Sequence, residues 1–135
     1  MIVDTSALVA TAKDELESEP LKRAMLRGGL VPAPVLLEYR RVMTERGARP
    51  APEAELLLQD LLSSELEVEP FTGEDTDLAA AANLAYGAGN GRGGRLNLLD
   101  LMVYATAKRL GLPILCTGQD FASTDAVIHP SSRPW

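Results

Sequence analysis

Short apolar runs alternate with helical segments along this chain, and that order constrains the fold more than any other feature. The runs that we expect to form strands are residues 1–3, 30–31, 66–70, 113–117 and 126–128. Helical patterns cover residues 7–12, 15–27, 34–43, 52–62, 74–86 and 98–110. Strands that are separated by helices favour a parallel sheet with helices on both faces. The sequence therefore predicts an α/β fold.

Several helix boundaries have chemical signals in the sequence. Thr72 is followed three residues later by Asp75, which is typical of a capping box. Asn97 is expected to cap the apolar helix that Gly111 ends, and Gly47 is expected to end the helix over residues 34–43. These signals set the limits of the longest helices before any packing is considered.

The bulk composition indicates one soluble domain spanning residues 1–135. Hydrophobic residues make up 46% of the chain and aromatic residues only 4%, so an aliphatic core is expected. The single cysteine, Cys116, excludes an internal disulfide and is consistent with a reducing compartment. No apolar run is long enough for a membrane span, and no secretory signal is apparent. We expect a cytoplasmic protein that does not bind membranes.

Four acids follow predicted strands or begin predicted helices. They are Asp4, Glu38, Asp100 and Asp120. In open α/β sheets ligands bind at the carboxyl ends of the strands, where Asp4 and Asp120 are expected. Mg²⁺ and Mn²⁺ prefer carboxylate oxygens, and clustered carboxylates hold such ions for attack on phosphodiesters. The net charge of −6 argues against a general nucleic-acid binder but is compatible with a metal-dependent nuclease.

Each of these acids also has a purely structural explanation. Asp4 could cap the helix that follows it, and Asp100 could stabilise a first helical turn. Glu38 could be a solvated surface acid, and Asp120 an ordinary turn residue. Only Asp100 stands among several apolar neighbours, where an unpaired charge is costly and a cation would be favourable. The residues alone leave both explanations open.

Four ordered motifs resemble those of PIN-domain proteins, specifically the VapC toxins of toxin–antitoxin pairs. The motifs occupy residues 1–8, 35–38, 96–115 and 117–125. The resemblance covers nearly the whole chain and is specific in combination, whereas each motif alone is weak. It implies a PIN-like three-layer sandwich, with a mostly parallel central sheet of four to five short strands.

The resemblance also implies an activity, which is Mg²⁺-dependent endoribonuclease cleavage by a metal-activated water, with Mn²⁺ as a possible substitute. Asp4 and Asp100 would be the metal ligands, and Glu38 would hold the metal or position its water. Thr5 and Ser6 would lie near the site and contribute a hydroxyl or an amide to substrate binding. The implied partners are an RNA substrate and a cognate antitoxin.

One position departs from the family pattern. Many members have an acid two residues after the threonine at the end of the strand, and Gln119 stands there in this chain. Either Asp120, one residue further on, substitutes for this acid, or the site uses only three carboxylates. Asp125 is a more distant candidate that we interpret as structural.

A glycine-rich loop over residues 87–94 precedes the helix that contains Asp100. Its G-x-G-x-x-G pattern follows a helix rather than a strand, so it fails the structural test of a dinucleotide-binding loop. Arg92 and Arg95 could instead bind RNA phosphates, or the loop could be a simple linker. The sequence does not separate these two alternatives.

A leucine-rich stripe lies in the predicted helix over residues 52–62. Its spacing is more typical of core, but part of it could contact an antitoxin helix or a second subunit, and we expect a homodimer. The alternatives to a toxin are an RNA-processing PIN nuclease and a non-catalytic α/β binding module. His129 is the only histidine, which argues against a ribonuclease mechanism that uses paired histidines.

Overall fold

The central sheet of this protein has four parallel strands. The computed structural model describes residues 1–15, 18–45 and 49–133. The strand order is β5-β2-β1-β6, formed by Leu66–Glu69, Gly29–Pro32, Ile2–Val3 and Ile114–Leu115. All three pairings are parallel, with Ile2 beside Leu30 on one side and beside Ile114 on the other. The parallel α/β class predicted from the sequence is confirmed.

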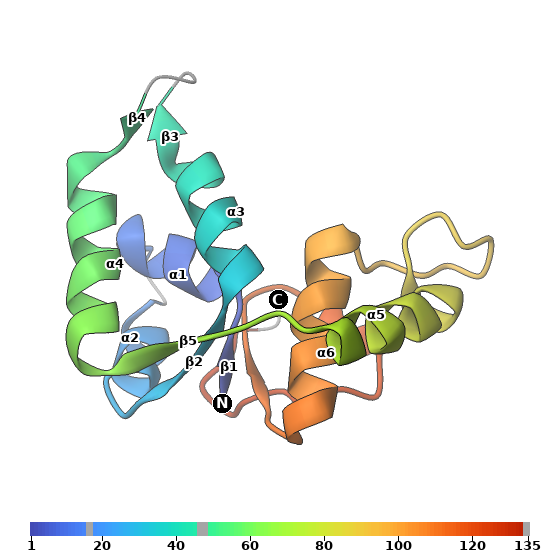
Figure 1. Cartoon of the computed structure of the whole chain (residues 1–135). Coiled ribbons are helices and arrows are strands. Elements are labelled where there is room, and N and C mark those ends of the chain that lie inside the picture. Colours follow the sequence, from blue (N-terminus) through green and yellow to red (C-terminus); the bar gives the residue numbers. More distant parts are fainter. Residues whose placement is uncertain (16–17, 46–48, 134–135) are drawn as a thin grey trace.

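Helices cover both faces of this sheet (Figure 1). The helices are α1 (Thr5–Ala12), α2 (Glu19–Met25), α3 (Ala33–Met43), α4 (Pro52–Ser64), α5 (Gly73–Tyr86) and α6 (Leu98–Leu110). The first, second and fourth lie together on one side, whereas α5 and α6 pack against each other on the opposite side. Helix α3 contacts both α1 and α6. These three layers place the carboxyl ends of the strands between α3 and α6.

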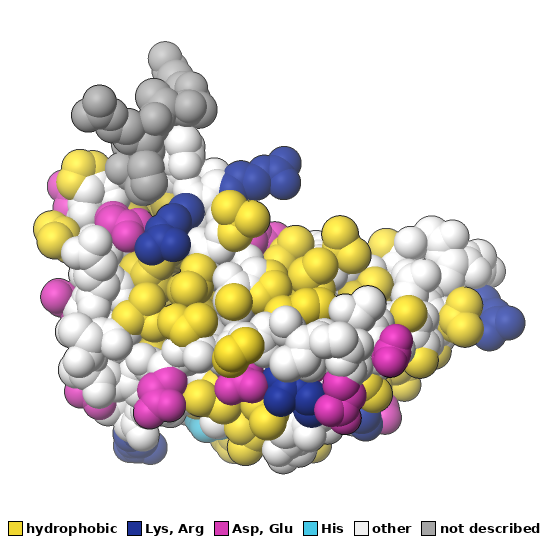
Figure 2. All heavy atoms as spheres, in the orientation of Figure 1, with side chains coloured by type: hydrophobic (Ala, Val, Ile, Leu, Met, Phe, Trp, Pro, Cys, Tyr) yellow, Lys and Arg dark blue, Asp and Glu magenta, His cyan; other side chains and the backbone are white. Residues whose placement is uncertain are grey.

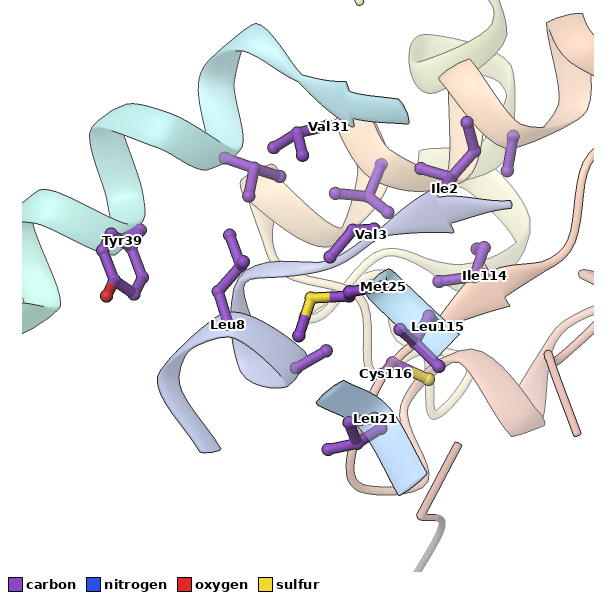
Figure 3. Packing of buried hydrophobic residues seen from close by; sticks show 14 of the residues in the cluster. Ile2, Val3, Leu8, Leu21, Met25, Val31, Tyr39, Ile114, Leu115 and Cys116 are labelled. Atoms are coloured by element: carbon purple, nitrogen blue, oxygen red, sulfur yellow. The ribbon is translucent and has the colours of Figure 1, made fainter. Parts of the chain in front are cut away.

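The core is aliphatic, as the composition predicted. Strand residues Ile2, Val3, Ile114 and Leu115 are fully buried and pack between the two helical layers (Figure 3). Val31 of β2 and the helix residues Leu8, Leu21, Met25 and Tyr39 complete this core, and all are at most 1% exposed. The two-residue strands of the central sheet, β1 and β6, are thus fully buried. Their ends are therefore held in fixed positions.

Three predicted helix boundaries agree in chemical detail with the structure. Thr72 and Asp75 form a reciprocal capping box at the start of α5. Asn97 caps α6 in the same way, and Gly111 ends it in the left-handed conformation with φ 65°. Gly47 lies outside the described residues.

Other predicted elements need correction. The helix predicted over residues 15–27 is shorter, because α2 begins at Glu19 with Pro20 in its first turn. The strand predicted over residues 126–128 is reduced to an isolated bridge between Ile114 and Ile128. A short antiparallel pair, β3 (Thr44–Glu45) and β4 (Arg49–Pro50), follows α3 and was not predicted. Thr44–Glu45 and Arg49–Pro50 contain no apolar run, which is the pattern by which the other strands were predicted.

Candidate metal and active site

Asp4 lies at the carboxyl end of the most central strand, between β1 and α1. Its side chain is 6% exposed, and one carboxylate oxygen, Oδ2, accepts hydrogen bonds from the Ser6 amide (3.0 Å) and the Ser6 hydroxyl (2.5 Å). The Ser6 hydroxyl in turn accepts a hydrogen bond from the Thr117 amide at 3.0 Å. Ser6 therefore links the acid at the end of β1 to the segment that follows β6.

Glu38 reaches the same region from the second turn of α3. The Thr5 hydroxyl donates a hydrogen bond to its Oε2 at 2.5 Å, across 33 positions of sequence. Thr5 is itself buried at 6% exposure and directly follows Asp4. At the start of α1, Thr5 thus holds Glu38 of α3, and the next residue, Ser6, holds Asp4.

Asp100 lies in the first turn of α6, where it completes the capping box. Its Oδ2 accepts a hydrogen bond from the Asn97 amide at 2.8 Å. Among the described residues, no donor contacts the other oxygen of Asp100 or the free Oε1 of Glu38. The capping roles suggested by the sequence are real for Asp4 and Asp100. They leave carboxylate oxygens available for another ligand.

The charges of these acids act on one another. The pKa of Asp100 is raised to about 7, first by burial and then by the charges of Asp4, Asp120 and Glu38, against the lowering effect of the hydrogen bond from the Asn97 amide. Burial also raises the pKa of Asp4, with Glu38 adding to the effect and the Ser6 hydrogen bonds opposing it. The carboxylates of the four predicted acids therefore repel one another. A bound cation would relieve this repulsion.

Asp120 is the acid near the fourth motif whose charge acts on Asp100, and its place as the fourth acid stays a prediction. Asp120 is exposed, but its charge acts on Asp100 and also helps to raise the pKa of buried Cys116 to about 12, an effect due first to burial. Asp125 is engaged elsewhere, accepting hydrogen bonds from Lys108 at 2.8 Å and from the Tyr104 hydroxyl at 2.5 Å. The structural interpretation of Asp125 is consistent with these contacts.

The donor set suits a magnesium ion that retains much of its water. Within residues 1–15, 18–45 and 49–133, no three Asp, Glu, His or Cys side chains lie close enough to enclose an ion directly. Mg²⁺ commonly binds through one or two carboxylates and keeps several waters. Asp4 and Asp100 fit that mode, and Glu38 could act through a water. The acids and their free oxygens are therefore compatible with the predicted ion.

The remaining predicted site residues fall into two groups. Thr5 and Ser6 lie in the site, but their hydroxyls are engaged by Glu38 and Asp4, so they position acids. Arg92 and Arg95 are exposed on the loop before α6. Direct contact of any of the four with RNA stays a prediction. Thr117 begins the fourth motif but was not predicted as a site residue, because its contribution is a backbone amide rather than a side chain.

The model of the PIN domain family matches residues 1–127 of the chain. The chain belongs to the PIN-domain family. It is 38% identical over 128 residues to Ribonuclease VapC42 of Mycobacterium tuberculosis, covering 93% of this chain and 95% of the relative. This family membership accounts for the order of the acidic motifs along the chain.

Solved PIN-domain structures share the overall fold. The crystal structure of Mycobacterium tuberculosis VapC20, a sarcin–ricin loop cleaving toxin, matches with a TM-score of 0.73 over 98% of both chains at 20% identity. A toxin–antitoxin complex from Klebsiella pneumoniae contains a chain that matches with a TM-score of 0.71 over 96% of both chains at 19% identity. The three-layer arrangement is therefore that of the family.

Proposed function

We propose that this PIN-domain protein is a Mg²⁺-dependent endoribonuclease that acts as the toxin of a toxin–antitoxin pair. The observation that supports the proposal is that burial and the charges of Asp4, Asp120 and Glu38 together raise the pKa of Asp100, while Thr5 and Ser6 hold Glu38 and Asp4 by hydrogen bonds. The relatives of 34–40% identity are named VapC ribonucleases, which supports RNA as the substrate.

The chemistry follows from the carboxylates. A divalent cation at this site would activate a water molecule and offset the negative charge that develops on the phosphodiester. Asp4 and Asp100 would hold the cation, and Glu38 would orient the attacking water through its free oxygen. Thr5 and Ser6 keep Glu38 and Asp4 from turning away, which preserves the geometry that the reaction needs.

The test is RNA cleavage by the purified protein. We expect cleavage with Mg²⁺ or Mn²⁺, loss of cleavage in EDTA, and little turnover with Ca²⁺, whose looser coordination positions water poorly. Asp4→Asn and Asp100→Asn should each lower cleavage by orders of magnitude, because they remove the charge that holds the ion and keep the size of the side chain. Cleavage that persists in EDTA and in Asp100→Asn would contradict the mechanism.

Two further variants, Asp120→Asn and Gln119→Asp, test which residue provides the fourth acid. If Asp120 contributes to the site, Asp120→Asn should weaken cleavage, and Gln119→Asp should change it little. If the fourth acid is instead missing, Gln119→Asp should tighten metal binding, and Asp120→Asn should have little effect. The toxin role is tested separately, by growth arrest on expression and its relief by the product of a neighbouring gene.

The partners that we propose are an antitoxin and a second copy of the chain. The leucine-rich stripe of α4 is an unsuitable interface, because Leu58 and Leu61 are buried and Leu56 is its only exposed leucine. A larger apolar surface lies between α3, α5 and α6, where Figure 2 shows hydrophobic side chains gathered in a hollowed face. We call it the α3–α5–α6 face.

Two adjoining hollows of about 380 and 360 Å³ form this face, and both are lined by Phe71 and Met102. Leu37 lines one hollow and is 73% exposed, and Leu98 lines the other and is 66% exposed. Projecting leucines beside apolar hollows make the face self-complementary, which is what a two-fold symmetric dimer requires. A second copy is therefore the occupant that we propose for it.

A further inference from the structure

The loop between α5 and α6 has a defined conformation that hydrogen bonds maintain. We call residues 87–97 the arm. Its two ends are joined by hydrogen bonds from the Leu96 amide to the Tyr86 carbonyl (2.9 Å) and from the Ala88 amide to the Leu96 carbonyl (2.8 Å). Leu96 is 1% exposed, which anchors the arm in the core. Figure 1 shows the segment between these ends extending away from α5 and α6.

Asn90 organises the end of the arm. Its side-chain Oδ1 accepts hydrogen bonds from the Arg92 amide at 2.8 Å and from the Gly94 amide at 3.2 Å. A Cβ added at Gly94 would lie 2.3 Å from the Gly87 carbonyl oxygen, so the two sides of the arm are in close contact. The backbone around Arg92 is therefore held in one shape by a single side chain.

The arm is positively charged in a chain that is negative overall. Arg92 and Arg95 are the only charged residues between Asp77 and Asp100, whereas the whole chain has a net charge of −6. Both arginines are exposed, and neither forms an ion pair with any other described residue. Figure 2 shows a basic side chain at the outer end of this part of the molecule. A polyanion would meet favourable charge here.

We propose that residues 87–97 form a phosphate-binding arm for the RNA strand, with Asn90 as the positioning residue that orders it. Arg92 and Arg95 would bind backbone phosphates outside the acidic site by paired guanidinium hydrogen bonds. The arm ends at the cap of α6, whose first turn contains Asp100, so a strand bound there is directed toward the acids. This inference rests on the proposed ribonuclease function, because it names how that substrate is held.

The test compares the binding of a fluorescein-labelled single-stranded RNA, measured by anisotropy with Ca²⁺ in place of Mg²⁺, with cleavage kinetics in Mg²⁺. For Arg92→Ala/Arg95→Ala we expect Kd and KM to rise at least about tenfold with kcat nearly unchanged, because the arm binds phosphates remote from the reaction. The slope of log Kd against log salt should fall by about 1.4 in size, for two lost phosphate contacts on a single strand.

Asn90→Ala separates positioning from charge. It removes no charge, yet KM should rise several-fold, with kcat and the melting temperature unchanged, if the shape of the arm matters. The matched control is Arg23→Ala/Arg27→Ala, which removes the same charge from exposed positions on and just after α2. The control should bind RNA as the wild type does, because those arginines lie away from the arm.

The outcomes distinguish the two proposals. If the double arm variant binds RNA with the wild-type Kd and salt slope while the wild type cleaves RNA, the arm inference fails and the ribonuclease stands. Equal weakening in the α2 control would also overturn the inference, since net charge would then explain the effect. If the wild type cleaves no RNA, the proposed function fails, and the anisotropy still decides whether the arm binds RNA.

Discussion

At the scale of single residues, the site depends on hydroxyl groups that hold acids. The Thr5 hydroxyl is the only group among the described residues that donates a hydrogen bond to Glu38. Thr5→Val keeps the shape of the side chain but removes the donor, so Glu38 should lose its fixed orientation. We expect cleavage to fall about 10- to 100-fold, as for other residues that orient metal ligands.

Thr5→Ser is the matched control for this prediction, because it keeps the hydroxyl. It should retain most of the cleavage rate, which a steady-state assay on RNA would measure. If Thr5→Val and Thr5→Ser are equally active, Glu38 does not depend on this hydrogen bond.

The raised pKa of Asp100 predicts how the metal-free protein responds to pH. The pKa in the folded state is about 7, compared with an ordinary value of 3.8. Between these values the folded state binds more protons than the unfolded state, so the free energy of unfolding should fall as pH rises from about 4 to 7. Thermal unfolding in EDTA across this range measures the effect.

Asp100→Asn removes this titrating group and mimics its protonated form. The variant should be at least as stable as the wild type at pH 8 in EDTA, and its melting temperature should depend less on pH. The prediction is contradicted if the melting temperature of the wild type rises steadily from pH 4 to 7 and that of the variant rises with the same slope. The pKa of Asp100 would then not be raised in the folded protein.

At the scale of elements, one ion-pair network joins β5, α5 and α6. Arg109 donates hydrogen bonds to Asp75 (Nε to Oδ1, 2.7 Å) and to Glu69 (Nη2 to Oε1, 2.9 Å). Asp75 is fully buried and also accepts a hydrogen bond from the Thr72 amide. Burial alone would raise the pKa of Asp75, but the hydrogen bonds from Arg109 and Thr72 lower it overall.

Asp75→Ala should therefore be strongly destabilising, because it leaves Arg109 without its closest partner and removes the carboxylate half of the capping box of α5. We expect the melting temperature to fall by at least about 5 °C. Glu19→Ala is the control, since it breaks the exposed pair with Arg23 and should cost at most about 2 °C. Equal losses in the two variants would contradict a special role for the network.

The elements also show what could be predicted from the sequence. The capping boxes at Thr72 and Asn97 were found because their chemistry is local, within four residues. The β3–β4 pair was missed because it has no apolar run, and the start of α2 was placed too early because the signal of Pro20 in its first turn was not used. The motifs pointed to Asp4, Glu38, Asp100 and Asp120, and the charges of the other three act on Asp100 in the structure. Their roles at a metal site stay predictions. The roles of Thr5 and Asn90 needed coordinates, since their hydrogen bonds depend on the folded backbone.

At the scale of the whole molecule, the apolar surface is unevenly placed. No helix of the described part of the chain is long and apolar enough to cross a membrane. For the exposed leucines of the α3–α5–α6 face we propose a second copy of the chain as the partner. Leu37→Glu should convert a dimer into a folded monomer, because Leu37 is 73% exposed and contributes little to the core. Light scattering combined with size-exclusion chromatography measures the mass.

The control is Leu56→Glu on α4, where the leucine is 59% exposed but stands outside this face. It should leave the mass unchanged. If wild type and Leu37→Glu have the same mass at every concentration, the proposed interface is wrong.

The central claim is that Asp4, at the end of β1, and Asp100, in the first turn of α6, hold one divalent cation. The most direct measurement is Mn²⁺ binding to the purified protein, followed by electron paramagnetic resonance of the free ion. We predict binding by the wild type, at least about tenfold weaker binding in Asp4→Asn and in Asp100→Asn, and wild-type binding in Glu67→Gln, an exposed acid on β5. Wild-type affinity for Mn²⁺ in Asp100→Asn would contradict the account.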